Sequence, residues 1–265
     1  MGSFRLTIGQ YFPTESWFHL LDPRVKILGT FVIIILVFFI NSFISYLFLS
    51  LFLYISYKVA RIPFLYLIKG LKPILFLIFI TFIFQMFFYG GEIIYKIWFI
   101  PIYKEGLVKG AYLSLRIIFL VTFTSFLTQT TSPLDIADGL EALFKGLKKV
   151  GVPVSELALM MSISLRFIPL LQSEVERIAK AQMARGIELN KGNMIKRLSN
   201  YIPILIPLFL SSFRRAEELA IAMEARCFKG GEGRTKLREL KMKKSDYIYL
   251  ISIVFVVILI LFFIQ

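Results

Sequence analysis

The stretch KILGTFVIIILVFFINSFISYLFLSLFLYISYK, residues 26–58, decides the fold of this 265-residue chain. Its apolar part, 27–57, has no charge and is longer than the about 20 helical residues that cross a bilayer core of about 30 Å. Asn41 and Ser42 divide the run near its middle. Two short membrane helices, 25–41 and 43–59, would place the basic residues that flank the run on one side of the membrane, as the positive-inside tendency favours.

The rest of the chain extends this membrane pattern. Apolar runs predict three more membrane helices at 71–90, 107–129 and 246–264. The composition agrees, because 57% of the residues are hydrophobic and 16% aromatic, which is too apolar for an ordinary soluble domain. The net charge of +14 is then expected in cytoplasmic segments. The sequence predicts an all-α polytopic membrane protein with a cytoplasmic amino terminus and an outer carboxyl terminus.

Three regions follow from this pattern. Residues 1–130 hold four transmembrane helices, 131–245 form a cytoplasmic region of amphipathic helices, and 246–265 form the final membrane helix. Within the cytoplasmic region, Ser132 and Pro133 predict the start of an interfacial helix over 133–149, which Gly151 ends. The segment 229–245, KGGEGRTKLRELKMKKS, is glycine-led and basic, and is expected to be mobile or to lie on anionic headgroups.

Two long helical segments, 155–186 and 195–228, complete the cytoplasmic region. Each starts apolar and ends charged and alanine-rich, so we expect each to start against the membrane and to project its charged end into the cytoplasm. Pro169 in the first segment, and Pro203 and Pro207 in the second, make straight helices improbable.

The two segments end in similar sequences, AQMARGIEL at 181–189 and AMEARCFKG at 222–230. One arginine at a helix end has a simple explanation, since it complements the helix dipole by about 0.3–1 kcal/mol, and Gly186 is typical of a helix cap. Two copies, at Arg185 and Arg226, instead predict paired docking tips. Glu188 and Glu224 near the tips either pair with basic residues of a partner or are solvated.

Several further stretches carry a resemblance to a known family. They are FHLLDPRVKIL (18–28), TTSP (130–133), GVPVSELALMMSISLRFIPLL (151–171), AQMARG (181–186), PLFLSSFRRAEELAIAMEAR (207–226) and GRTKLREL (233–240). Together, in this order and over most of the chain, they resemble the transmembrane T component of energy-coupling factor (ECF) transporters. Two Ala-Arg-Gly elements are distinctive of that family, and here they read Ala-Arg-Gly at 184–186 and Ala-Arg-Cys at 225–227.

The resemblance implies a coupling scaffold in the cell membrane of a prokaryote. Its two coupling helices dock two cytoplasmic ATPases, identical or homologous, and its other surfaces hold a membrane-embedded S component that binds a vitamin or a metal ion. The implied docking residues are Ala184, Arg185, Gly186, Ala225, Arg226 and Cys227. Cys227 stands where glycine is usual, so we expect the second helix to continue a turn into Phe228 before Gly230 ends it.

Other functions are excluded or kept as alternatives by the residues present. KGGEGRTK lacks the spacing of a phosphate loop, so the chain is expected to bind no cofactor itself and to leave ATP and Mg²⁺ to the partner ATPases. With one His and one Cys, neither a metal site nor a catalytic triad can be assembled. Basic and aromatic residues do not alternate as in nucleic-acid binders. No carboxylate lies inside a span to couple an ion gradient.

Arg116 is the charge well inside a predicted span, where it either pairs with another helix or a partner, or reaches outward to the interface. Two alternatives to the coupling scaffold remain open at this level. The chain could anchor a cytoplasmic partner without a transport cycle, or it could be a conventional permease with its own substrate path.

Overall fold

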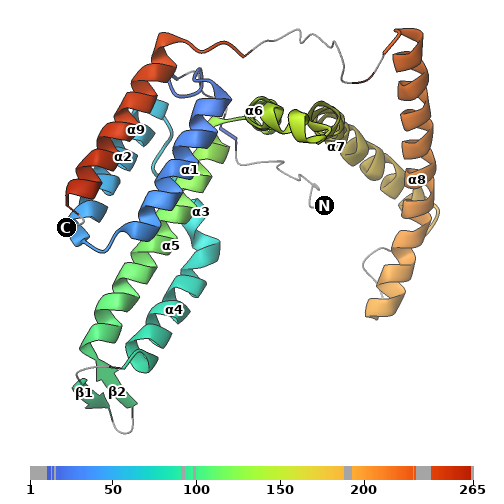
Figure 1. The fold of residues 1–265 in the computed structure, drawn as a ribbon. Coiled ribbons are helices and arrows are strands. Elements are labelled where there is room, and N and C mark those ends of the chain that lie inside the picture. Colours follow the sequence, from blue (N-terminus) through green and yellow to red (C-terminus); the bar gives the residue numbers. More distant parts are fainter. Residues whose placement is uncertain are drawn as a thin grey trace. The chain divides into compact units, whose positions relative to one another are not determined.

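The computed structural model describes residues 11–12, 14, 16–90, 93–97, 100–187, 193–228, 230 and 240–263. The chain divides into two compact units (Figure 1). The membrane unit comprises Gly9–Leu143 with Glu239–Gln265, and the crossed-helix unit comprises Phe144–Arg238 with Met1–Ile8.

Helices dominate the membrane unit, and the predicted all-α polytopic membrane fold is confirmed. The helices are α1 (Pro23–Phe39), α2 (Phe43–Ala60), α3 (Leu65–Leu71), α4 (Leu75–Phe88), α5 (Lys104–Thr130), α6 (Pro133–Phe144) and α9 (Lys244–Phe262), with one 3₁₀ turn, η1 (Lys72–Ile74), joining α3 to α4. Within the described residues, five helical stretches are long and apolar enough to cross a membrane: α2, Leu65–Phe88, α5, α9 and, in the crossed-helix unit, α7 (Val154–Ala184).

Four of these five stretches match predicted membrane helices, and the fifth does not. The predicted helix at 25–41 is α1, whose 17 residues span about 25 Å, slightly less than a bilayer core. The fifth stretch, α7, was predicted only to start against the membrane. It qualifies by length and composition because its first half carries just two charged side chains, Glu156 and Arg166.

The predicted division of the first apolar run is present, because α1 ends at Phe39 and α2 begins at Phe43. Asp22 caps α1, accepting a bond from the Arg24 N–H at 2.9 Å, and Pro23 takes the first helical position. At the other end, Arg116 of α5 donates from Nη2 to the carbonyls of Phe38 at 3.0 Å and Ile40 at 3.4 Å. Arg116 therefore binds the carbonyls that α1 leaves unpaired at its end. Of the two alternatives for Arg116, the structure shows pairing with another helix.

Helix α5 lies at the centre of the membrane unit, in contact with α1, α2, α3 and α4, while α9 packs against α1 and α2 (Figure 1). Small residues let these helices approach closely. A Cβ at Gly29 of α1 would clash with Ile253 of α9, and a Cβ at Gly106 of α5 would clash with the backbone carbonyl of Gln85 in α4. Apolar and aromatic side chains fill the space between the helices, among them Val25, Ile33, Leu49, Phe123, Phe126 and Ile253.

The connection between α4 and α5 contains a feature that the sequence did not predict. Strands β1 (Ile93–Ile97) and β2 (Ile100–Tyr103) pair antiparallel, with a register shift between Ile93 and Tyr95. The pattern IIYKI followed by IPIY is rich in β-branched residues, which suit a pleated ribbon.

The predicted interfacial helix over 133–149 is divided between the two units. The Ser132 hydroxyl accepts a bond from the Asp135 N–H at 3.1 Å and donates to the Asp135 carboxylate at 2.7 Å, so the predicted cap of α6 is confirmed. The helix then tightens into a 3₁₀ segment, η2 (Lys145–Val150). Gly151, at φ 85°, ends it, as predicted.

The crossed-helix unit contains η2, α7 and α8 (Met194–Ala225). Each of the two predicted segments is one continuous helix through its prolines, Pro169 in α7 and Pro203 and Pro207 in α8. The two helices contact each other. In the basic segment predicted to be mobile or headgroup-bound, residues 229 and 231–239 lie outside the described residues.

Candidate docking site

The first predicted tip, Arg185, is the cap residue of α7. The Gly186 N–H donates to the Met183 carbonyl at 3.0 Å, and the Ile187 N–H donates to the Gln182 carbonyl at 3.1 Å. Gly186 has φ 89°. This pair of bonds around a left-handed residue is the Schellman motif, which satisfies the last carbonyls of a helix. The backbone that carries Arg185 is therefore fixed by hydrogen bonds on both sides.

The second tip, Arg226, is the cap residue of α8 and has the same geometry. The Cys227 N–H donates to the Glu224 carbonyl at 2.8 Å, and the Phe228 N–H donates to the Met223 carbonyl at 3.0 Å. Cys227 has φ 54°, the left-handed conformation that Gly186 adopts in the first tip. The expected continuation of the helix into Phe228 is therefore wrong. Helix α8 ends at Ala225, because the cap bonds hold Cys227 in the left-handed conformation. That conformation is costly for a residue with a Cβ.

The docking residues that the resemblance implies are open to a partner at both tips. Ala184, Arg185 and Gly186 are exposed at the end of α7, as are Ala225, Arg226 and Cys227 at the end of α8. Glu224 is exposed beside the second tip, whereas Glu188 lies outside the described residues. The structure thus presents two guanidinium groups on matched, hydrogen-bonded helix ends.

The chemistry of these ends favours binding of carboxylates or carbonyls. The end of a helix carries a partial negative charge, which stabilises a cation there. Because each cap already satisfies its helix carbonyls, the guanidinium need not turn back to bind them. A guanidinium offers five donors in a plane and can grip a carboxylate with two parallel bonds.

A buried polar cluster in the membrane unit escaped the sequence analysis. Asp246 is 1% exposed and accepts bonds from the N–H groups of Asp22 at 2.8 Å and Lys243 at 2.6 Å. Lys26, one of the basic residues that flank the first apolar run, is also buried and donates to the carbonyls of Thr130 at 3.0 Å and His19 at 3.3 Å. These bonds link the start of α1 to the start of α9 and to the end of α5.

Asp22 belongs to the same cluster and carries a perturbed carboxyl group. Burial opposes its ionisation, but hydrogen bonds from the side chain and backbone of Arg24 outweigh that effect and lower the pKa of Asp22 below its usual value. A sequence signal for the cluster exists in retrospect, since Asp22, Arg24 and Lys26 stand within one turn at the start of an apolar helix.

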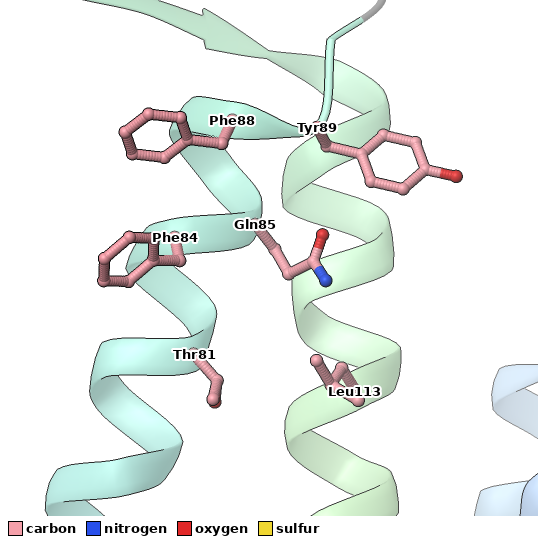
Figure 2. Close-up of a pocket in the computed structure, with 6 residues that line it drawn as sticks. All are labelled: Thr81, Phe84, Gln85, Phe88, Tyr89 and Leu113. Atoms are coloured by element: carbon pink, nitrogen blue, oxygen red, sulfur yellow. The ribbon is translucent and has the colours of Figure 1, made fainter.

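A hollow of about 350 Å³ lies beside α4 and α5. Figure 2 shows Phe84 and Phe88 pointing away from α5, while Gln85 points toward it. Thr81, Tyr89 and Leu113 complete the lining. The hollow is open and its lining has no charged side chain, so it lacks the groups that would orient a charged substrate. In the part of the chain that the structure describes, no three His, Cys, Asp or Glu residues gather to hold a metal ion.

Comparisons with known proteins agree with the resemblance noted in the sequence. The family model described as cobalt transport protein (CbiQ) matches residues 14–237. An energy-coupling factor transporter transmembrane protein EcfT of Clostridium kluyveri is 51% identical over 92% of this chain and 91% of its own length. Proteins of the same name from Bacillus subtilis and Lactococcus lactis are 46% and 43% identical, each over 97% of both chains.

Proposed function

Because this chain belongs to the family of energy-coupling factor transporter transmembrane proteins, we propose that it docks two cytoplasmic ATPases through Arg185 and Arg226. The observation that carries the proposal is the matched geometry of the two tips. Both arginines occupy the cap position of a Schellman motif and both are exposed. Two equal ends on one unit suit two equal or similar partners, one at each end.

The proposed cycle follows from this docking. The ATPases close on ATP and open after hydrolysis, each carrying one arginine tip with it, so that the ends of α7 and α8 move relative to each other. The apolar first halves of these helices form the platform for a membrane-embedded S component. Exposed apolar side chains on α8, such as Ile195, Ile202 and Phe209, support this role. Movement of the platform reorients the S component and releases its cargo, a vitamin or a metal ion.

The orientation in the membrane is part of the same proposal. The region 131–245 lies in the cytoplasm with the ATPases, the amino terminus is on the same side, and the carboxyl terminus is outside. Lys58 in the last turn of α2 and Arg61 at its cap support this orientation, because both are basic. This chain binds neither ATP nor Mg²⁺ in the proposal, and the partner ATPases supply both.

Replacement of both tip arginines tests the docking. In the double variant Arg185→Glu and Arg226→Glu, the ATPases should no longer co-purify with the membrane complex, whereas membrane insertion should be retained. Losing one partner of a buried interfacial charge pair costs about 2–5 kcal/mol, which is about 30-fold or more in affinity for each tip. Arg214→Glu, an exposed arginine on α8, is the matched control and should leave the complex intact. Retention of the ATPases by the double variant would refute the docking role.

A further inference from the structure

The contact between α7 and α8 contains two buried polar side chains, both from α7. The buried residues of α7 are Val154, Ala158, Glu174 and Gln182. Glu174 is 7% exposed and Gln182 is 9% exposed, and each of them bonds to α8. Burying a polar group costs free energy unless it is hydrogen-bonded. The bonds of these two side chains to α8 therefore offset the cost of burying them in this contact.

Gln182 binds a carbonyl that a proline leaves without its usual donor. In an α-helix the carbonyl of residue 203 accepts from the N–H of residue 207, but Pro207 has no N–H. The Gln182 Nε2 donates to the Pro203 carbonyl at 3.2 Å. The proline in α8 therefore creates the acceptor that α7 uses, and the bond replaces one that the helix itself cannot make.

Glu174 forms an ion pair across the two helices. One carboxylate oxygen accepts from Arg177 Nη2 of the same helix at 2.7 Å, and the other accepts from Arg215 Nη2 of α8 at 3.3 Å. The Arg177 side chain is 76% exposed, but that of Arg215 is 33% exposed. Although it is longer, the pair with Arg215 is therefore the one less screened by solvent.

The two contacts are well separated along both helices. They lie eight residues apart on α7 and twelve apart on α8, by the numbering of the two bonded pairs, which corresponds to about 12 Å and about 18 Å. One contact would act as a pivot about which the helices could rotate. Two contacts at this separation resist rotation and so define one crossing angle.

Gln182 also belongs to the first tip. Its carbonyl accepts the Ile187 N–H of the Schellman motif and the Arg185 N–H, while its side chain holds α8. The backbone that carries Arg185 is thus bonded directly to the residue that fixes the crossing.

We propose that Glu174 and Gln182 are positioning residues that set the resting crossing angle of α7 and α8, so that displacement of one tip is transmitted to the other helix. The proposal rests on the docking function for its role in transport, but the crossing itself is a property of this chain. During the proposed cycle the ATPases move the tips away from this resting angle, and the two contacts oppose that change. Without the contacts the helices rotate freely about their apolar contact, so the tips no longer move against a defined resting state.

Distance measurements on the full chain in lipid nanodiscs test the crossing without any partner. Spin labels on the native Cys227 and on Met183→Cys, both exposed, report the separation of the helix ends by double electron–electron resonance. We expect one narrow distance distribution, which broadens or gains a second peak in Glu174→Gln. Glu218→Gln, an exposed carboxylate on α8, is the matched control and should leave the distribution unchanged.

Two further variants keep this test decisive if Glu174→Gln fails to insert. Arg215→Gln removes the α8 partner of Glu174, and Gln182→Leu removes the donor to the Pro203 carbonyl. Each variant should broaden the distribution. Combining Glu174→Gln with Arg215→Gln should broaden it no further than either change alone, because both remove the same bond. Unchanged distributions in the inserted variants would overturn the proposal.

Transport per ATP hydrolysed, measured in the reconstituted complex, tests the link to function. Glu174→Gln should leave the ATPases bound and hydrolysing but lower this ratio about fivefold or more, the size of a typical coupling between sites. A broadened distribution with an unchanged ratio would overturn the transmission role alone. Failure of the docking proposal would show separately, as ATPases that stay bound when Arg185 and Arg226 are both replaced.

Discussion

The left-handed conformation of Cys227 predicts that the two helix caps differ in stability although their bonds match. Gly186 adopts φ 89° without steric cost, whereas Cys227 adopts φ 54° with a Cβ. Exchanging the residue types, as Cys227→Gly in α8 and Gly186→Cys in α7, should therefore strengthen the second cap and weaken the first. A Cβ added at Gly186 would meet no atom within 4 Å, so the second change tests the backbone alone.

The magnitude follows from two opposing terms. A left-handed residue with a Cβ costs about 1–2 kcal/mol, and glycine adds back about 0.4–1 kcal/mol through the larger freedom of the unfolded chain. The net gain for Cys227→Gly is then about 0.5–1 kcal/mol, and the loss for Gly186→Cys is similar. For local opening of a cap, this difference changes the exchange rate of a protected amide about two- to fivefold.

Hydrogen exchange with residue-level mass spectrometry measures the effect on the full chain in nanodiscs. The reporter amides are Phe228, bonded to the Met223 carbonyl, and Ile187, bonded to the Gln182 carbonyl. After correction for intrinsic rates, Phe228 should exchange more slowly in Cys227→Gly, and Ile187 should exchange faster in Gly186→Cys. Cys227→Ala keeps the Cβ and should change little. Equal rates in both exchanged variants would refute the argument from backbone conformation.

Four further outcomes are expected. Cys227, exposed at the second tip, should react with a maleimide in the isolated chain and be protected in the full complex, and equal labelling would place the tip away from the interface. Arg116→Met should lower the thermal unfolding midpoint of the chain in detergent, because it removes the bonds to the Phe38 and Ile40 carbonyls; an unchanged midpoint would mean that lipid or water replaces them. Gly106→Val should impair folding far more than Gly146→Val, because a Cβ at Gly106 meets the Gln85 carbonyl and one at Gly146 meets nothing, and equal yields of folded protein would contradict this. The pKa of Asp22 is lowered in the folded chain, so its stabilising contribution is present above the unfolded value of about 3.8 and is lost as pH falls; Asp22→Asn should therefore destabilise at neutral pH and make little difference in strong acid, and a pH-independent effect would count against the ion pair.

The sequence predicted those features that depend on composition and local chemistry. Long apolar runs determine where membrane helices lie, and Asn41-Ser42 determined the turn of the first hairpin. The Ser132 cap and the stop at Gly151 were predicted because each depends on a few neighbouring residues. The left-handed conformation of Cys227 was not predicted, because a residue with a Cβ usually avoids it. In the structure the two cap bonds overcome that cost.

Contacts between distant segments were beyond the sequence. Arg116 looked equally suited to a partner helix or to the interface, because nothing local shows that the end of α1 lies within its reach. Lys26 was interpreted only as one of the basic residues that flank the first apolar run, yet it is buried and donates to two backbone carbonyls. In both cases a long side chain binds carbonyls that belong to another part of the chain, and such acceptors carry no side-chain signature.

Pro207 shows how one residue can link local and distant structure. From the sequence it only weakened the expectation of a straight helix, because it removes a donor from α8. That missing donor is also what leaves the Pro203 carbonyl available to Gln182, so a local defect in α8 becomes the acceptor for a bond from α7. An alanine at position 207 would restore the helical bond and set it in competition with Gln182. Restoring the helical bond in α8 and weakening its crossing with α7 are therefore consequences of the same change.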